Sequence, residues 1–201
     1  MLYYLYVHKK ITNIAEIILG YTFRKAIEKT KEGSVFVLQA ANIKVNEDIL
    51  DISELVNISS SPKYSPSFLE YNDVILISRG SGFGSFRSSV YLLENKNVIA
   101  SSSVFIIRVK DKVVIPKYLS IYLNSEEAQK DISQIITGGS YIQSLSRIEL
   151  ENLKVPIPPI NIQESIIELY DNIKEQDRIL RRKNQLKKNI ISATIKNLTR
   201  K

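Results

Sequence analysis

The sequence contains no cysteine and a single histidine, His8. Without cysteine, neither a disulfide framework nor a thiolate metal site can form, and one histidine leaves no zinc site of the common types. No serine has a histidine partner other than His8, so a serine–histidine catalytic pair is not indicated. The absence of cysteine is also typical of a reducing compartment.

Long apolar runs are missing as well. No stretch approaches about 20 apolar residues, the length needed to cross a bilayer. The N-terminal MLYYLYV is short and has neither a basic region before it nor a cleavage site, so it does not match a signal peptide. We therefore expect a soluble, cytoplasmic protein.

Nucleotide-binding and methyltransferase motifs are absent. There is no GKS or GKT, and the only Pro-Pro pair is flanked by isoleucines, so it is not the tetrapeptide of amino-methyltransferases. Gly80, Gly82 and Gly84 follow a strand pattern, but the segment 85–93 after them is β-branched and aromatic, which favours a loop between two strands over a dinucleotide site. We predict no cofactor, metal or catalytic residues.

One enzymatic alternative stays open at this point. Asp73, Glu94 and Lys96 fit the loose spacing of nucleases that hold Mg²⁺ with two acids and a lysine. Such a nuclease requires the three side chains to converge within a few ångströms. A second alternative is an oligomerising protein with no role on DNA.

The net charge of +7 suggests an anionic partner such as nucleic acid, but the charge is unevenly spread. Residues 1–160 carry 18 Lys plus Arg against 16 Asp plus Glu, whereas residues 161–201 carry 10 against 5. Most of the excess therefore lies near the C-terminus, where it can serve pairing with another protein.

The first 160 residues predict a mixed α+β body that is rich in strands. Apolar and β-branched runs predict strands, and residues 11–20 fit either a helix or a strand. Pro116 predicts the start of a helix, and a second follows at 128–136. The predicted strands cover 2–7, 35–45, 74–78, 88–93 and 98–109, and the predicted loops cover 59–68, 79–87 and 137–146. The strand at 35–45 leads into a polar turn around Gln39 and Asn42, and the run 74–78 has the pattern of a short buried strand.

The C-terminal segment predicts one long amphipathic helix. Prolines at 156, 158 and 159 stop the body, and Asn161 is the expected N-cap with Glu164 at the capping-box position. At about 1.5 Å per residue the helix spans about 55 Å and needs a partner. Its predicted contact residues, mostly three or four apart, are Ile162, Ile166, Leu169, Ile173, Leu180, Leu186, Ile190 and Leu198.

The charge order along this helix predicts the direction of its partner. Acidic residues fill 164–177, whereas basic residues fill 178–201. An identical helix running antiparallel would place each acidic half beside a basic half, so we predict an antiparallel coiled coil. Gln176 and the six-residue step from Leu180 to Leu186 interrupt a strict heptad, which favours a bundle with another protein's helices over a two-stranded coil. The alternative is a solvated helix folded back on its own domain.

Several stretches, taken in order, resemble the specificity subunits of type I restriction-modification enzymes. Each is weak alone, but their order is fairly specific and covers nearly the whole chain. They are IAEIILGYTFR (14–24), VFVLQAANI (35–43), YNDVILISRGSGFG (71–84), VIASSSVFIIRV (98–109), VIPKYLSIYLNS (114–125), ITGGSYIQSLSRIELENLKVPIPPINIQESI (136–166) and the terminal helix.

The resemblance implies a target recognition domain at 1–160 that grips double-stranded DNA, and a spacer and dimerisation helix at 161–201. Family members are non-catalytic; they bind modification subunits, which supply S-adenosylmethionine chemistry, and the restriction subunit. They usually carry two domains and two antiparallel helices. This sequence has one of each, so it looks like a half subunit, and a homodimer would read a symmetric split site. A truncated fragment, or a half that pairs with a different half, remains an alternative.

Paired donors and acceptors read bases, and basic or hydroxyl side chains hold phosphates. We therefore expect the DNA contacts mainly in four places: the glycine loop, the amides Gln39 and Asn42, and the loops at 59–68 and 137–146. Most of the candidates also have an alternative without DNA contact. The arginines of the glycine loop would be solvated, the two amides would bond their own turn, Tyr141 would pack under its loop, and residues 24–25 would be ordinary surface. The candidates are Arg24, Gln39, Asn42, Lys63, Tyr64, Arg79, Ser81, Ser85, Arg87, Ser140, Tyr141 and Gln143.

Overall fold

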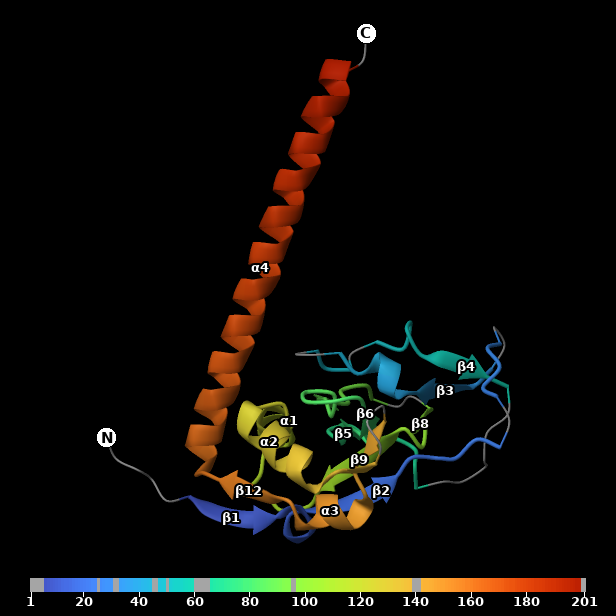
Figure 1. Cartoon of the computed structure of the whole chain (residues 1–201), viewed down its shortest axis with the longest axis vertical. Helices are drawn as coiled ribbons and strands as arrows, with labels where there is room; N and C mark the ends of the chain where they lie inside the picture. Colours follow the sequence, from blue (N-terminus) through green and yellow to red (C-terminus); the bar gives the residue numbers. More distant parts are fainter. Residues whose placement is uncertain are drawn as a thin grey trace.

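The protein consists of a strand-rich body from which one long helix projects, as the computed structural model shows (Figure 1). The structure describes residues 6–24, 26–30, 33–44, 47–49, 51–59, 66–94, 97–138 and 142–199. The mixed α+β class and the long C-terminal helix predicted from the sequence are both confirmed.

A four-stranded antiparallel sheet forms the centre of the body, in the order β2-β9-β5-β7. Its strands alternate between two hydrophobic clusters. Leu76 and Ile107 point to one cluster, whereas Ile75 and Ile106 point to the other. The sheet is therefore buried on both faces. Its strands are β2 (Ala15–Leu19), β5 (Val74–Ile77), β7 (Ser88–Val90) and β9 (Val104–Val109).

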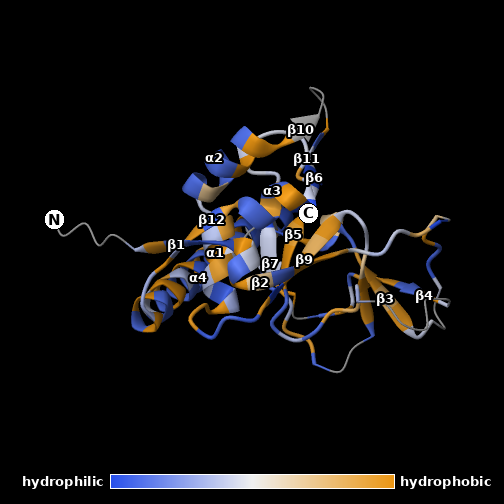
Figure 2. Ribbon diagram, turned by 90° about the horizontal axis from the view of Figure 1, so that it is seen from below, coloured by the Kyte–Doolittle hydropathy of each residue, from blue (hydrophilic) through white to orange (hydrophobic). Residues whose placement is uncertain are grey.

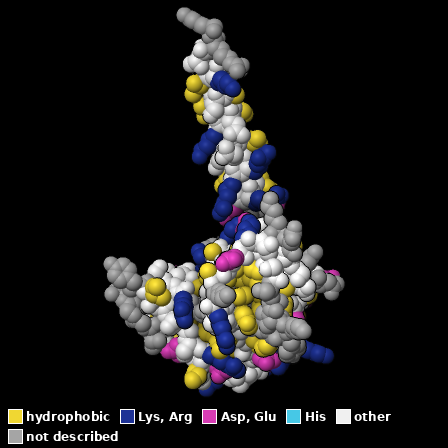
Figure 3. All heavy atoms as spheres, turned by 90° about the vertical axis from the view of Figure 1, so that its right-hand side faces the viewer, with side chains coloured by type: hydrophobic (Ala, Val, Ile, Leu, Met, Phe, Trp, Pro, Cys, Tyr) yellow, Lys and Arg dark blue, Asp and Glu magenta, His cyan; other side chains and the backbone are white. Residues whose placement is uncertain are grey.

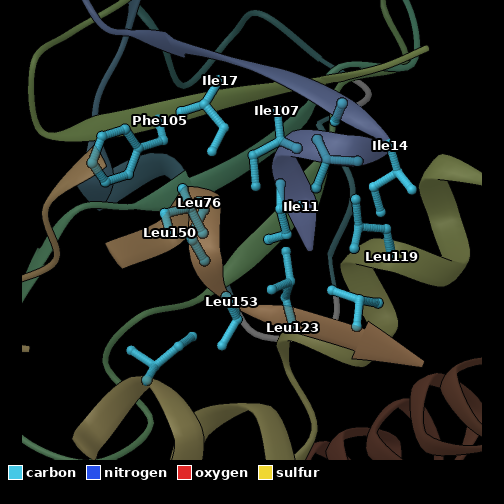
Figure 4. Packing of buried hydrophobic residues seen from close by; sticks show 14 of the residues in the cluster. Ile11, Ile14, Ile17, Leu76, Phe105, Ile107, Leu119, Leu123, Leu150 and Leu153 are labelled. Carbon is cyan, nitrogen blue, oxygen red and sulfur yellow. The ribbon is translucent and has the colours of Figure 1, made fainter. Parts of the chain in front are cut away.

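Three short helices cover one face of this sheet. Figure 4 shows Leu119 and Leu123 beside Ile11 and Ile14, with Leu150 next to Leu76. Pro116 occupies the first turn of its helix, where the missing N–H costs nothing, and Ser125 caps the next by accepting from Ala128 N at 3.2 Å. These helices are α1 (Pro116–Leu123), α2 (Glu126–Ile135) and α3 (Arg147–Asn152).

The other face packs against a second sheet in the order β4-β3-β8. β3 (Val35–Leu38) pairs antiparallel with β4 (Val56–Ile58) and parallel with β8 (Val98–Ala100). A 3₁₀ turn, Ala40–Asn42, follows β3. The far side of this sheet is covered by Tyr21 and Phe23, whose rings meet edge to face.

Two smaller sheets complete the body. β1 (Val7–Lys10) pairs with β12 (Lys154–Ile157) directly before α4 (Ile160–Thr199). β10 (Thr137–Gly138), β11 (Gln143–Ser144) and β6 (Arg79–Gly80) form the other sheet. A 3₁₀ turn, Ile11–Asn13, separates β1 from β2, so residues 11–20 hold a turn followed by a strand.

The structure corrects several predictions about local structure. The strand predicted at 2–7 is observed as β1 at Val7–Lys10, and residues 2–5 of the prediction lie outside the described residues. The run 98–109 is two strands in different sheets, because the turn Ser101–Ser103 breaks it: Val104 N bonds Ser101 O at 3.1 Å. Short strands β10 and β11 lie within the predicted loop 137–146. Helix α4 begins at Ile160, before Asn161, so Asn161 is not the cap; the N–H groups of Ile162 and Gln163 donate to Pro159 O.

Candidate nucleic-acid interface

The glycine loop at 79–87 and the segment after residue 142 lie side by side. Gln143 pairs with Gly80 and Ser144 with Arg79 in an antiparallel ladder, and Leu145 N donates to Ser78 O at 3.0 Å. Figure 2 shows β6, β10 and β11 gathered at one edge of the body. Two stretches about 60 residues apart in sequence therefore form one surface.

Glycine is required in this loop for two separate reasons. Gly82 and Gly84 have φ of +100° and +77°, a conformation that side-chain-bearing residues rarely adopt. At Gly80 a Cβ would lie 2.0 Å from the Ser85 Oγ, which itself donates to Gly82 O at 2.6 Å. The loop is thus a tight turn whose backbone lies open at 82 and 84.

Two amide side chains hold the end of the loop against the helices. Asn124 both accepts from Ser88 N at 2.8 Å and donates to Ser88 O at 2.9 Å. The buried Gln129 donates to Phe86 O at 2.8 Å and to Leu123 O at 2.7 Å. The C-terminal end of the loop is therefore fixed to the helices by hydrogen bonds to its backbone, as a recognition loop needs.

The serine turn Ser101–Ser103 connects this loop to the turn after β3. Ser78 N donates to Ser103 O at 3.0 Å, and Ala40 N donates to Ser103 Oγ at 3.1 Å. The turn after β3 and the start of the glycine loop are thus held by the same serine turn. Sequence reasoning missed this serine turn, because its residues were assigned to one continuous strand.

The predicted contact residues differ in how they are presented. Arg79 and Ser81 are exposed, whereas Ser85, Arg87 and Gln143 are half-buried. The Nε of Arg87 is buried and has no hydrogen-bond partner among the described residues. Arg24 is exposed, after the bridge between Tyr21 and Ser101. Four candidates and Lys25 lie outside the described residues: Lys63, Tyr64, Ser140 and Tyr141.

Asn42 is used for local structure. Its Oδ1 accepts from Gln39 N at 2.8 Å, and its Nδ2 donates to Glu54 O at 2.9 Å. The amides of Gln39 and Asn42 form a capping box around the 3₁₀ turn. This geometry favours the alternative in which the two amides bond their own turn over bidentate reading of adenine.

Two exposed apolar side chains on this surface were not predicted. Phe83 at the tip of the glycine loop is 62% exposed, and Ile142 beside β11 is 67% exposed. An aromatic residue set between two glycines was the available signal for Phe83. Apolar side chains of this kind insert between base steps in some DNA-binding proteins.

Asp73, the centre of the nuclease alternative, has a structural role. It is 1% exposed and receives Arg108 Nε at 2.9 Å, Arg108 Nη2 at 2.8 Å and Glu70 N at 2.7 Å. The hydrogen bonds from Arg108 to the Asp73 carboxylate raise the pKa of the guanidinium. Glu94 is exposed, and Lys96 lies outside the described residues. Within the described ranges no group of three His, Asp or Glu could hold a metal ion, so the nuclease alternative is not supported.

The base of α4 is fixed to the body by a fully buried amide. Gln163 is 0% exposed; its Oε1 accepts from Ile115 N at 2.9 Å, and its Nε2 donates to Val113 O and Pro158 O at 2.7 and 2.8 Å. Gln163 follows Pro158 and Pro159 in a Pro-Pro-x-x-x-Gln pattern within the stretch 136–166, and the sequence alone gave it no separate role. The structure shows that this pattern sets where the helix leaves the body.

A cluster of charges supports the same junction. Lys117 on α1 pairs with Asp48 and lies 3.5 Å from Asp171 on α4, and Lys174 reaches Asp48 at 3.5 Å. The Lys117 ammonium also lies 5.8 Å from the centre of the Tyr170 ring. Burial raises the pKa of the Tyr170 hydroxyl to about 12, so it stays neutral.

Replacing Gln163 with leucine is expected to destabilise the body by about 2–3 kcal/mol, because the buried hydrogen bond to Pro158 O and the half-buried bonds with Ile115 N and Val113 O would be lost together. Urea unfolding monitored by circular dichroism measures the change. The matched control is Gln185→Leu on the exposed part of α4, which should change stability by less than about 0.5 kcal/mol. Equal effects of the two substitutions would contradict the anchoring role.

Beyond its base, α4 is exposed on all sides. Leu169 is 63% exposed, Leu180 55% and Leu198 79%, and Figure 3 shows basic and hydrophobic side chains along the part that extends beyond the body. The helix does not fold back on its own domain (Figure 1). No helix in the described ranges has both the length and the apolar character to cross a membrane.

The continuous helix divides its predicted contact residues between two faces. At 100° per residue, Leu186 and Ile190 lie about 120° and 80° away from Leu180 and share a face with Ile179. The remaining six lie on one face: Ile162, Ile166, Leu169, Ile173, Leu180 and Leu198.

Comparison with solved structures shows the same fold. The S subunit of a type I restriction-modification system from M. genitalium is 18% identical, with a TM-score of 0.58; the match covers 92% of this chain and 43% of that one. The HsdS subunit from Thermoanaerobacter tengcongensis is 20% identical, with a TM-score of 0.59, covering 88% and 39%. A chain from a structure of complex assembly and conformational transition of the type I R-M system is 18% identical, with a TM-score of 0.66, covering 96% and 43%.

This chain spans less than half the length of each of these proteins. The model of the family described as type I restriction modification DNA specificity domain matches residues 5–199, which is nearly the whole sequence. With the strand-rich body and the projecting helix, this match shows that the chain belongs to the type I restriction-modification DNA specificity domain family.

Proposed function

We propose that this chain is a non-catalytic, sequence-specific DNA-binding subunit of a cytoplasmic type I restriction-modification system. It directs modification subunits, and where present a restriction subunit, to a split DNA site. The observation that carries the proposal is the joined surface of the glycine loop and β11 on a body of this family.

The chemistry of that surface suits a DNA duplex. Arg79 offers the planar fork of donors that matches the acceptors of guanine, and the Ser81 hydroxyl suits a phosphate oxygen. At Gly82 and Gly84 no Cβ stands between the backbone and a ligand, so a phosphate can approach closely. The half-buried Gln143 beside Gly80 adds an amide of the kind that reads adenine.

The exposed helix supports a homodimer. A helix of 40 residues with leucine and isoleucine more than half exposed is unfavourable alone in water. The acidic half at 164–177 and the basic half at 178–199 complement each other when a second copy runs antiparallel. Two bodies at opposite ends of such a pair would read inverted half-sites separated by a spacer that the helix length sets.

A second apolar face on α4 supports a further partner. Ile179, Leu186 and Ile190 are 56%, 45% and 65% exposed and lie away from the Leu180 side of the helix. One helix pair covers one face, so this second face fits helices contributed by the modification subunits, in a bundle.

Arg79→Ala tests the DNA surface. Binding to duplexes that the unmodified chain selects from a random-sequence pool should weaken by about 5- to 150-fold, because a bidentate base contact contributes about 1–3 kcal/mol. Fluorescence anisotropy at fixed salt measures the dissociation constant. Lys110→Ala is the matched control. Lys110 is exposed and pairs with Glu16. It lies directly after the C-terminal end of β9, whereas the serine turn lies before the N-terminal end of that strand. Equal weakening by both variants would place the DNA contact elsewhere.

A further inference from the structure

We propose that two copies of α4 pair antiparallel in one defined register, with the two-fold axis beside Leu180 and with Gln176 of each copy facing Asn184 of the other. The inference rests on the proposed homodimer and adds its geometry. Gln176 and Asn184 are the residues that fix the register.

The contact face of α4 follows the helix period without drift. From Ile162 to Leu198, 36 residues are crossed in ten steps of three or four, which is 3.6 residues per step. A heptad pattern of 3.5 would require a supercoil, whereas this pattern keeps one face on a straight helix. We call it the Leu180 face; its positions are Ile162, Ile166, Leu169, Ile173, Gln176, Leu180, Asn184, Lys187, Ile191, Thr194 and Leu198.

The spacing of the Leu180 face is symmetric about Leu180. Steps of four, three, four, three and four residues lead outward in both directions. An antiparallel pair of identical helices needs such symmetry, because each position must meet its mirror position on the partner. The resulting pairs are Ile162 with Leu198, Ile166 with Thr194, Leu169 with Ile191, Ile173 with Lys187, Gln176 with Asn184, and Leu180 with Leu180.

In most of these pairs an apolar side chain meets an apolar one or an amide meets an amide. Ile162 and Leu169 meet apolar partners, and the Lys187 stem can cover Ile173 while its ammonium reaches water. Leu169, Leu180 and Ile191 are 63%, 55% and 59% exposed in the single copy, so a partner has apolar surface to bury. The same register sets the acidic segment 164–177 beside residues 183–196 of the second copy, which carry Lys183, Lys187, Lys188 and Lys196.

Gln176 and Asn184 select this register over its neighbours. Each is an exposed amide within an otherwise largely apolar face, and an amide buried without a partner is costly. In the proposed register the two amides meet and can exchange hydrogen bonds. A displacement that moves Leu180 one turn along its partner places Leu180 opposite Gln176 or Asn184 instead. Polar pairs of this kind fix register in coiled coils.

The absence of cysteine allows a direct test by single-cysteine crosslinking. In Leu180→Cys the two sulfurs meet at the axis, where Cα atoms about 6 Å apart allow a disulfide. Mild oxidation should convert most of this variant to a covalent dimer. In Ile173→Cys the two cysteines lie 14 residues apart along the pair, about 21 Å, and in Leu186→Cys they lie on another face. Both controls should stay uncrosslinked.

A mixed experiment adds a second readout. The Leu169→Cys chain and the Ile191→Cys chain should each stay uncrosslinked when oxidised alone. When the two are mixed and oxidised, a disulfide should join one chain of each kind. Crosslinking of Ile173→Cys or Leu186→Cys in place of Leu180→Cys would overturn the register while leaving the homodimer intact. A monomeric mass for the unmodified chain would overturn the homodimer itself, so the two failures are distinguishable.

Discussion

Asp73→Ala is expected to lower the free energy of unfolding by about 3 kcal/mol, the low end of the range for breaking a buried ion pair. The low end applies because the Arg108 side chain is 22% exposed and would keep its second ion pair, with Glu70 Oε1 at 2.6 Å. The backbone N–H of Glu70 would lose its acceptor as well. Urea unfolding measures the loss.

The matched control for this substitution is Asp51→Ala. Asp51 is exposed, and among the described residues its carboxylate bonds Ser53 and the Ile52 backbone, so its removal should leave the free energy of unfolding nearly unchanged. If Asp73→Ala were as stable as this control, the Arg108–Asp73 pair would not be a structural anchor. A catalytic role for the carboxylate would then deserve renewed study.

Leu180→Glu is expected to raise the dissociation constant of the homodimer at least about 100-fold. The two-fold axis would set the two new carboxylates against each other in an apolar contact, and such like-charge pairs cost several kcal/mol. Analytical ultracentrifugation over a concentration series measures the change.

Ser192→Glu adds the same charge to the same helix on a side that carries neither the Leu180 face nor Ile179, Leu186 and Ile190. Its dissociation constant should stay within about threefold of the unmodified chain. A dimer that tolerates both substitutions equally would show that the Leu180 face is not the contact between copies.

The elements that were predicted well are those whose pattern depends on burial alone. The run Val74–Ile77 is apolar at every position because its sheet is covered on both faces, and it was identified as a buried strand. The long helix was identified from apolar residues at helical spacing and from the prolines before it.

The elements that were missed depend on tertiary hydrogen bonds. The run 98–109 reads as one strand by composition, and only the contacts of Ser101 and Ser103 with Leu38, Ala40 and Ser78 show where it turns between sheets. Asn161 fits the rules for an N-cap, yet the helix begins at Ile160, two residues earlier than that cap allows, with the Pro159 carbonyl accepting its first hydrogen bonds. Neither contact can be inferred from local spacing.

The candidate DNA surface was predicted in part. The glycine loop was identified from its arginines and glycines, but its pairing with β11 joins strands of only two residues, too short to leave a periodic signal. The role of Gln163 was missed because two of its three partners are backbone atoms of a distant segment, at Val113 and Ile115. Such roles depend on how the chain folds back on itself.

The solution mass of the unmodified chain tests the central claim most directly. Light scattering at micromolar concentration should give twice the 22.9 kDa of one chain, because paired α4 helices would bury the exposed leucines and isoleucines and join two DNA-reading bodies. A mass of 22.9 kDa at every concentration tested would contradict the account, since a single body cannot read two inverted half-sites.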